Sequence, residues 1–165
     1  MLDSEKRVYE LLDRLGVKYD KYEHEPIMTI AAAEEIDKKI GFEMCKNLFL
    51  STKHGTEFYL LVMVGSKKFN TGRVSKQVQV PRMTFAGDDK MLEYLDIYPG
   101  SVSPLGLMND KNNMVNLLID SDVLKMEKIA VHPCVNTATV VISVKDLIEI
   151  ILPETGHNFK EVLVD

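Results

Sequence analysis

The chain has 165 residues with 45% hydrophobic and 27% charged side chains, and its formal net charge is −5. This is the composition of a globular protein with a sizeable core, and the length fits one domain over residues 1–165. The negative charge argues against a protein that coats nucleic acid, and no apolar run reaches the roughly 20 residues of a membrane-spanning helix. The charged N-terminus also lacks the apolar segment of a secretory signal, so we expect a cytoplasmic protein without membrane contacts.

The first quarter of the chain predicts two helices and a strand. Apolar residues recur at helical spacing over residues 3–15, which indicates an amphipathic helix. Residues 17–24 alternate as a strand does. Thr29 can cap a short helix over residues 30–39, which Gly41 terminates.

The next segment predicts a β-hairpin. Two apolar runs, residues 44–52 and 57–64, flank a short polar connection that contains Gly55. A weaker helical pattern follows at residues 70–78, and residues 82–86 resemble a short strand.

The rest of the chain mixes helices and strands. A helix is expected at residues 88–95, and a long loop rich in Gly, Pro, Ser and Asn at residues 98–113. Three strands, a helix and a final extended segment follow, at residues 114–120, 128–132, 137–143, 143–152 and 159–164. This order predicts an α+β (mixed α/β) fold with a mixed, largely antiparallel sheet packed by helices.

Lys46 lies inside an apolar run, MCKNLFL. Burying a lysine is costly unless its ammonium group meets an anion or a cavity. Two interpretations are open: a strand with a hydrated outer face, or a cation aimed at a phosphate or at a developing oxyanion.

The segment PGSVSPLG, residues 99–106, is a second candidate site. Gly100 permits unusual backbone dihedrals and Pro104 stiffens the exit, so the residues between them could present successive N–H groups to an anion. The alternative is an ordinary turn.

The segment VHPCVNTATVVIS, residues 131–143, is a third. Pro133 cannot donate to a strand ladder, so the chain turns there and places His132 and Asn136 at a corner of a sheet. The corner is either a hairpin whose histidine bonds to the backbone, or the wall of a chemical site.

The cysteines suggest no catalytic or metal site. With two cysteines, we expect reduced thiols rather than a disulfide scaffold. A nucleophile made of Cys134 and His132 lacks an orienting third group. A zinc site made of Cys45, Cys134, His24 and His132 lacks paired ligand spacing, so no metal and no cofactor is expected.

Basic residues are concentrated between positions 65 and 82, where no acidic residue occurs. The cations are Lys67, Lys68, Arg73, Lys76 and Arg82. The stretch is either a solvated basic face or a local contact with RNA.

Taken together, these segments resemble the freestanding YbaK/ProX editing proteins, relatives of the insertion domain of bacterial prolyl-tRNA synthetase, and the ProX branch in particular. The resemblance covers almost the whole chain and depends on five motifs in the right order. They are HEPIMTIAAAEE from His24, KNLFL from Lys46, PGSVSPLGLMND from Pro99, HPCVNTATVVIS from His132, and TGHNFKEV near the end.

The resemblance implies a role for each candidate residue. Lys46 would face the terminal adenosine of a tRNA and its phosphate. The amides of a catalytic loop would hold the aminoacyl carbonyl and position the attacking water, and this loop would contain Gly100, Ser101 and Val102. The amino-acid pocket would be lined by His132, Asn136, Ser103, Pro104 and Thr29. The tRNA phosphates would be contacted by Lys67, Lys68, Arg73 and Lys76.

The implied function is trans-editing: hydrolysis of mischarged Ala-tRNA(Pro), with the tRNA acceptor end as partner and prolyl-tRNA synthetase as a further candidate partner. An aminoacyl ester is already activated, so oriented water and preorganised amides suffice without a protein nucleophile. Two alternatives remain open. One is a Cys-tRNA(Pro) deacylase of the YbaK type, and the other is a non-catalytic module that senses aminoacyl-tRNA.

Overall fold

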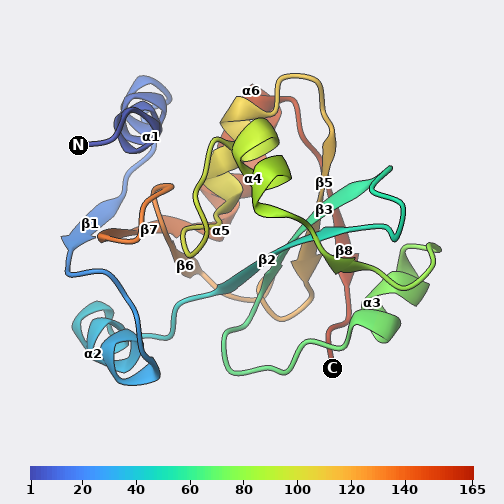
Figure 1. Cartoon of the computed structure of the whole chain (residues 1–165). Coiled ribbons are helices and arrows are strands. Elements are labelled where there is room, and N and C mark those ends of the chain that lie inside the picture. Colours follow the sequence, from blue (N-terminus) through green and yellow to red (C-terminus); the bar gives the residue numbers. More distant parts are fainter.

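A computed structural model describes all residues, 1–165, and divides the strands between two sheets (Figure 1). The larger sheet has the strand order β4-β2-β3-β5-β8, with bounds Thr84–Phe85, Lys46–Ser51, Phe58–Met63, Val115–Asp120 and Phe159–Val162. β2 pairs antiparallel with β3 and β4, whereas β3, β5 and β8 run parallel. The predicted hairpin and the mixed α/β class are therefore confirmed.

The smaller sheet is antiparallel throughout, with the order β1-β7-β6 and the bounds Asp20–Glu23, Ala138–Ser143 and Lys128–Val131. Residues 132–137 connect β6 to β7, at the corner that the sequence predicts. The division into two sheets is a feature that the strand pattern did not indicate.

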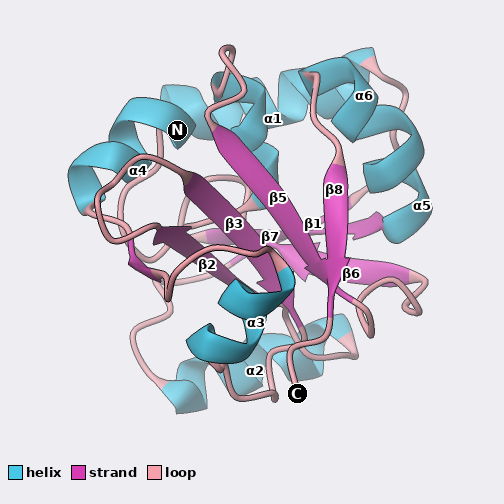
Figure 2. Ribbon diagram, turned by 90° about the vertical axis from the view of Figure 1, so that its right-hand side faces the viewer, coloured by secondary structure: helices cyan, strands magenta, loops and turns pink.

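Six α-helices surround the sheets: α1, α2, α3, α4, α5 and α6, at Asp3–Arg14, Ile30–Ile40, Thr71–Gln77, Asp88–Leu95, Val144–Asp146 and Leu152–Thr155. A π-helical turn, Leu147–Ile151, joins α5 to α6, so the helix extends beyond the predicted residues 143–152. In Figure 2, α3 lies against one face of the larger sheet. None of the helices is both long and apolar enough to cross a membrane.

The two faces of the larger sheet bury different cores. Leu60 of β3 belongs to a cluster of 28 buried residues to which both sheets and α1, α4, α5 and α6 contribute. The next residue, Leu61, points to the opposite face and belongs to a cluster of 9 buried residues that includes Val74 of α3. Because β3 is buried on both faces, its sequence is an unbroken apolar run.

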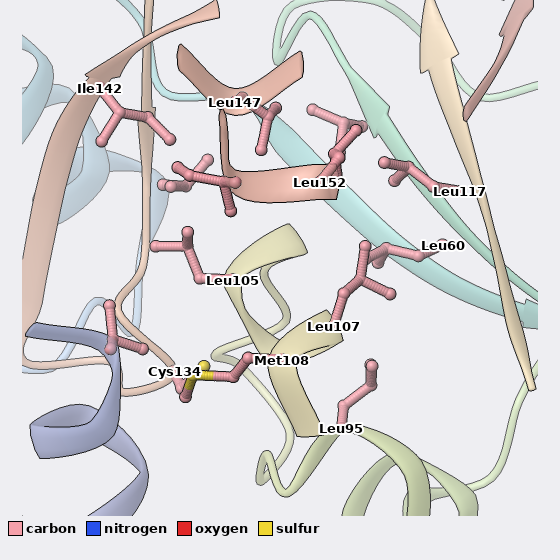
Figure 3. Packing of buried hydrophobic residues seen from close by; sticks show 14 of the residues in the cluster. Leu60, Leu95, Leu105, Leu107, Met108, Leu117, Cys134, Ile142, Leu147 and Leu152 are labelled. Atoms are coloured by element: carbon pink, nitrogen blue, oxygen red, sulfur yellow. The ribbon is translucent and has the colours of Figure 1, made fainter. Parts of the chain in front are cut away.

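The segment expected to be a long loop, residues 98–113, contains a buried 3₁₀ helix instead. Pro104–Asn109 form this helix in the larger core, with Pro104 in its first turn (Figure 3). Its side chains Leu105 and Leu107 are 1% exposed, and Figure 3 shows them pointing into the packed interior. Burial of these leucines outweighs the turn-forming tendency of the neighbouring glycines and prolines.

A buried hydrogen bond between two side chains fastens the end of the chain to the core. The Nε2 atom of His157 lies 3.0 Å from the Oδ2 atom of Asp110, and its Nδ1 atom lies 2.8 Å from the carbonyl oxygen of Thr155. The Asp110 carboxylate also accepts the N–H groups of Met114 and Val115, at 3.0 and 2.8 Å. The pair therefore connects the start of β5 to the turn that precedes β8.

We predict that His157→Ala strongly destabilises the fold, because it leaves the carboxylate of Asp110 buried without its hydrogen-bonding partner. The expected loss is about 3–5 kcal/mol of unfolding free energy, measured by urea denaturation. His54→Ala, in the exposed β2–β3 turn, is the matched control and should change the free energy by less than about 0.5 kcal/mol. Equal effects of the two substitutions would contradict the structural role of His157.

Candidate functional site

The β6–β7 connection holds His132 half-buried at the end of the smaller sheet. Its Nδ1 atom lies 3.0 Å from the carbonyl oxygen of Ala138, so a proton on Nδ1 is donated there and Nε2 keeps its lone pair. Burial lowers the pKa of His132 below its ordinary value, the bond to Ala138 opposes this, and the neighbouring His24 lowers the pKa further. The ring is therefore a neutral hydrogen-bond acceptor at neutral pH.

The segment from His24 to Thr29 is fixed at both ends. The Nε2 atom of His24 lies 2.8 Å from the Oγ1 atom of Thr139 in β7. At the other end, the Oγ1 atom of Thr29 accepts the N–H of Ala32 at 3.0 Å, which confirms the predicted cap of α2. The side chain of Thr29 is engaged in this cap, and the residue is exposed.

Asn136 joins three segments that are distant in the sequence. Its Oδ1 atom accepts the N–H of Ile27 at 3.3 Å, and its Nδ2 atom donates to the carbonyl of Ile27 at 3.2 Å. Gly100 is near the same side chain, because a Cβ added to Gly100 would be 3.8 Å from the Nδ2 atom. Gly100 has φ +92°, a conformation that favours glycine. The loop, the corner and the 24–29 segment therefore meet at one amide side chain.

The loop after Gly100 contains amides that no protein group accepts. The N–H groups of Gly100, Ser101 and Val102 make no hydrogen bond within the chain. The side chain of Ser103 has a structural role, because its Oγ atom accepts the N–H of Leu105 at 3.2 Å and caps the 3₁₀ helix that starts at Pro104. Ser101 and Ser103 are 5% and 0% exposed, so the loop is anchored in the core.

Lys46 and His132 line the same cavity. This cavity has a volume of about 560 Å³, and residues of the segment 27–37, residues 43–45 just before β2 and the 65–66 turn complete its wall. The Nζ atom of Lys46 donates to the carbonyl oxygen of Lys67 at 3.0 Å. Residues 100–104 do not line this cavity. Gly100 is close to Asn136, Asn136 is hydrogen-bonded to Ile27, and Ile27 lines the cavity. The structure therefore links the Gly100 loop to Lys46 and His132 through these contacts, although the loop is not part of the cavity wall.

Gly65 is a residue of this cavity that the sequence did not single out. A Cβ added there would lie 2.4 Å from the carbonyl oxygen of Met44 and 2.6 Å from the Oε1 atom of Glu43. Only glycine allows the two backbone segments to approach this closely, beside Lys46. The sequence feature that could have drawn attention to Gly65 is its position directly before the basic segment SKK.

Residues 24–150 match the family described as the aminoacyl-tRNA editing domain. The chain belongs to this family. The match extends from His24 to the π-helical turn and includes Lys46, the Gly100 loop and the His132 corner. The resemblance found in the sequence is thereby confirmed, together with the class of enzyme, an aminoacyl-tRNA deacylase, which is a hydrolase.

Two relatives and one solved structure align with nearly the whole length of this chain. The chain is 34% identical over 161 residues to the prolyl-tRNA editing protein ProX of Acetoanaerobium sticklandii, covering 98% of both proteins. It is 32% identical over 165 residues to the mouse prolyl-tRNA synthetase associated domain-containing protein 1, covering 96% of both. A crystal structure provisionally described as a trans-editing enzyme for prolyl tRNA synthetase is 20% identical, with a TM-score of 0.71, covering 99% of this chain and 98% of that one. This last likeness concerns the fold alone.

The surroundings of Lys67 do not agree with the expected contact between this residue and tRNA phosphates. Its ammonium group lies 2.9 Å from Asp120, 2.7 Å from Asp122 and 3.1 Å from Asp165. Burial alone would lower the pKa of Lys67, but hydrogen bonds to these three carboxylates outweigh burial and raise it. The ammonium group is therefore neutralised inside the protein, and Lys67 serves the site through its backbone carbonyl, which accepts from Lys46.

The other three predicted phosphate contacts are placed differently. Lys68, Arg73 and Lys76 are exposed and form no ion pair with any carboxylate of the chain. They lie on α3 and in the loop before it, on the side of the larger sheet that α3 covers. Their geometry leaves them free to meet an anion.

The two thiols are inert. Burial raises the pKa of Cys45 and of Cys134 to about 12, so both are protonated at neutral pH and are poor nucleophiles. No group of three or more His, Cys, Asp or Glu side chains is arranged to hold a metal ion.

The lowered pKa of His132 predicts a pH dependence of stability. As the pH falls below the ordinary histidine value of 6.5, the unfolded chain binds the proton first, because the folded pKa is lower. Stability that is present above pH 6.5 is therefore lost as the pH falls through the folded pKa of His132.

An NMR titration of the imidazole C–H signals measures this pKa, with His132→Asn to assign the resonance. Thermal unfolding of both proteins at pH 7.5 and 5.5 provides the second readout, and the loss on acidification should be smaller in the variant. A His132 signal that titrates at or above 6.5 would contradict the burial argument.

Proposed function

We propose that this chain hydrolyses the ester bond of Ala-tRNA(Pro) and so removes alanine from a mischarged tRNA. The observation that carries the proposal is the row of unengaged amides at Gly100, Ser101 and Val102, held next to Asn136. Preorganised N–H groups of this kind stabilise the oxyanion of acyl transfer without reorganising during the reaction.

In the proposed reaction, water attacks the ester carbonyl while these amides donate to the developing oxyanion. Each such donor contributes about 3–4 kcal/mol in well-studied enzymes. The bond between the carbonyl carbon and the ribose oxygen then breaks, the ribose oxygen takes up a proton, and alanine leaves. The terminal ribose hydroxyl of the tRNA assists, so that no protein nucleophile is required. The high pKa of both thiols agrees with this assignment.

Lys46 is proposed to bind the phosphate of the terminal nucleotide. Its ammonium group has three N–H donors, and a single hydrogen bond, to the carbonyl of Lys67, engages it in the protein. The remaining donors are free to meet an anion at the cavity, where a charge-assisted bond is stronger than a neutral one.

His132 is proposed to select the amino acid. Its neutral Nε2 atom can accept a hydrogen bond from the ammonium group of an aminoacyl ester. A synthetase pocket built for proline discriminates poorly against alanine, because a missing methylene is worth only about 1–3 kcal/mol. A second, smaller pocket that admits alanine and refuses proline by size corrects this error.

The choice of tRNA(Pro) is supported by what the relatives are called. The Acetoanaerobium sticklandii relative is named a prolyl-tRNA editing protein, and the mouse relative is named for an association with prolyl-tRNA synthetase. We therefore propose the acceptor end of tRNA(Pro) as the substrate, prolyl-tRNA synthetase as the upstream enzyme, and the cytoplasm as the place of reaction.

We predict that Lys46→Ala lowers kcat/KM for deacylation of Ala-tRNA(Pro) by about 100-fold, because a hydrogen bond from a charged group is lost. Release of labelled alanine from the tRNA measures the rate. Lys53→Ala, in the exposed β2–β3 turn, is the control and should keep the wild-type rate. Unchanged turnover of a folded Lys46→Ala protein would remove Lys46 from the mechanism.

A panel of alanyl, cysteinyl, seryl and prolyl esters of tRNA(Pro) tests the substrate. We expect the alanyl ester to be cleaved at least about tenfold faster than the prolyl ester, because a pocket that fits alanine excludes the larger proline by size. His132→Ala should reduce this ratio while the unfolding midpoint changes little. Cleavage of the cysteinyl ester alone would indicate a YbaK-type deacylase, and binding without cleavage of any ester would indicate a sensing module.

A further inference from the structure

A second groove lies on the face of the larger sheet that α3 covers, and the proposed reaction does not use it. It has a volume of about 760 Å³. Its walls come from the edge of β2, from the loop that leads into α3 and from the segment around β4. The lining residues are Leu50, Lys68, Phe69, Asn70, Thr71, Arg82, Met83, Thr84 and Phe85.

The groove is positively charged although the chain is negative overall. Lys68 and Arg82 stand on its two walls, and no acidic residue lines it. Both side chains are exposed, and neither forms an ion pair with a carboxylate of the chain. By contrast, the adjacent Lys67 is neutralised by three carboxylates. Two unpaired cations facing one groove are complementary to an anion.

Two aromatic rings share the groove with these cations. The ring centroids of Phe69 and Phe85 are 6.2 Å apart, with planes inclined by 57°. Phe85 is 66% exposed, so it contributes little to the core. An exposed aromatic face beside unpaired cations is the combination that binds single-stranded nucleic acid, in which bases stack on rings and phosphates meet cations.

The two walls are held together before any ligand binds. The hydroxyl of Thr71 donates to the carbonyl of Met83 at 2.8 Å, and the N–H of Met83 donates to the Oγ atom of Ser75 at 2.9 Å. These bonds join α3, which directly follows the loop that carries Phe69, to the segment that carries Phe85. The groove is therefore preorganised, which lowers the entropic cost of ordering a flexible ligand.

We propose that this groove binds the unpaired nucleotides that precede the aminoacylated end of the RNA, with a base stacked on Phe85 and phosphates at Lys68 and Arg82. The proposal rests on the proposed function. The position of the groove supports it, because Lys68 directly follows Lys67, whose carbonyl accepts the ammonium of Lys46. The groove and the cavity of Lys46 and His132 are thus linked through two consecutive residues, Lys67 and Lys68.

Steady-state kinetics on two substrates of different length test the groove. The substrates are Ala-tRNA(Pro) and 3′-O-alanyl-adenosine, which carries no preceding nucleotides. For Phe85→Leu and Arg82→Gln, we expect the ratio of kcat/KM for the tRNA to that for the adenosine ester to fall about tenfold, mainly through KM. Phe85→Leu keeps the apolar volume and removes only the aromatic face.

Leu92→Ala, at an exposed apolar position of α4, and Lys53→Ala are the matched controls and should leave the ratio unchanged. An unchanged ratio in both groove variants would overturn the proposal. An equal loss on both substrates would overturn it as well, because the groove would then act on the acyl end.

Direct binding separates failure of the groove from failure of the proposed function. Fluorescence anisotropy with a labelled single-stranded RNA ending in CCA, a blunt RNA duplex and an acidic peptide requires no turnover. We expect the single strand to bind most tightly and Phe85→Leu to weaken it about tenfold, even if no ester is cleaved. Preference for the duplex or the peptide, or equal binding by Phe85→Leu, would contradict the assignment of unpaired nucleotides.

Discussion

The buried carboxylate of Asp120 determines where the loop between β3 and α3 lies. Asp120 is 0% exposed, and it accepts the N–H of Val64 at 3.1 Å and the ammonium of Lys67 at 2.9 Å. A buried charge of this kind is tolerated only when it is paired and hydrogen-bonded, and removal of a partner typically costs about 3–5 kcal/mol. The loop is therefore fixed by an electrostatic requirement at the end of β5. In this loop, the carbonyl of Lys67 accepts a hydrogen bond from Lys46, and Gly65 lines the cavity of Lys46 and His132. Lys68, from the same loop, lines the second groove.

Some backbone groups of the loop at Gly100 hydrogen-bond within the protein, and others have no partner and are free for the proposed reaction. Ser103 caps the 3₁₀ helix, because its hydroxyl and carbonyl oxygens accept the N–H groups of Leu105 and Gly106. The amides just before it, at Gly100, Ser101 and Val102, have no acceptor. Leucine side chains of the 3₁₀ helix are packed in the larger core and hold the loop in place. Hydrophobic packing three to seven residues further along the chain thus gives this loop the rigidity that the proposed oxyanion site needs.

Elements that depend on neighbouring residues could be predicted from the sequence. The β2–β3 hairpin and the helix that begins after Thr29 and ends at Gly41 were confirmed, because turn and cap residues act over a few positions. The partners of Lys67 could not be predicted, since Asp120 is 53 residues away and the basic run itself contains no acid. The site residues Lys46 and His132 were indicated by the resemblance. Their common cavity, by contrast, depends on how two sheets pack, which no local pattern encodes.

A net charge of −5 does not prevent this chain from meeting RNA. At physiological ionic strength, charges further apart than about 8 Å are largely screened, so a phosphate in the groove responds mainly to Lys68 and Arg82. The acids that neutralise Lys67 lie in its own cluster, where they stabilise the loop instead of opposing the ligand. A few unpaired cations give weak and salt-sensitive contact, while stacking on an aromatic ring is insensitive to salt. Under the proposed function, weak electrostatic contact lets the enzyme sample many charged tRNAs, and the proposed acyl pocket decides which ester is cleaved.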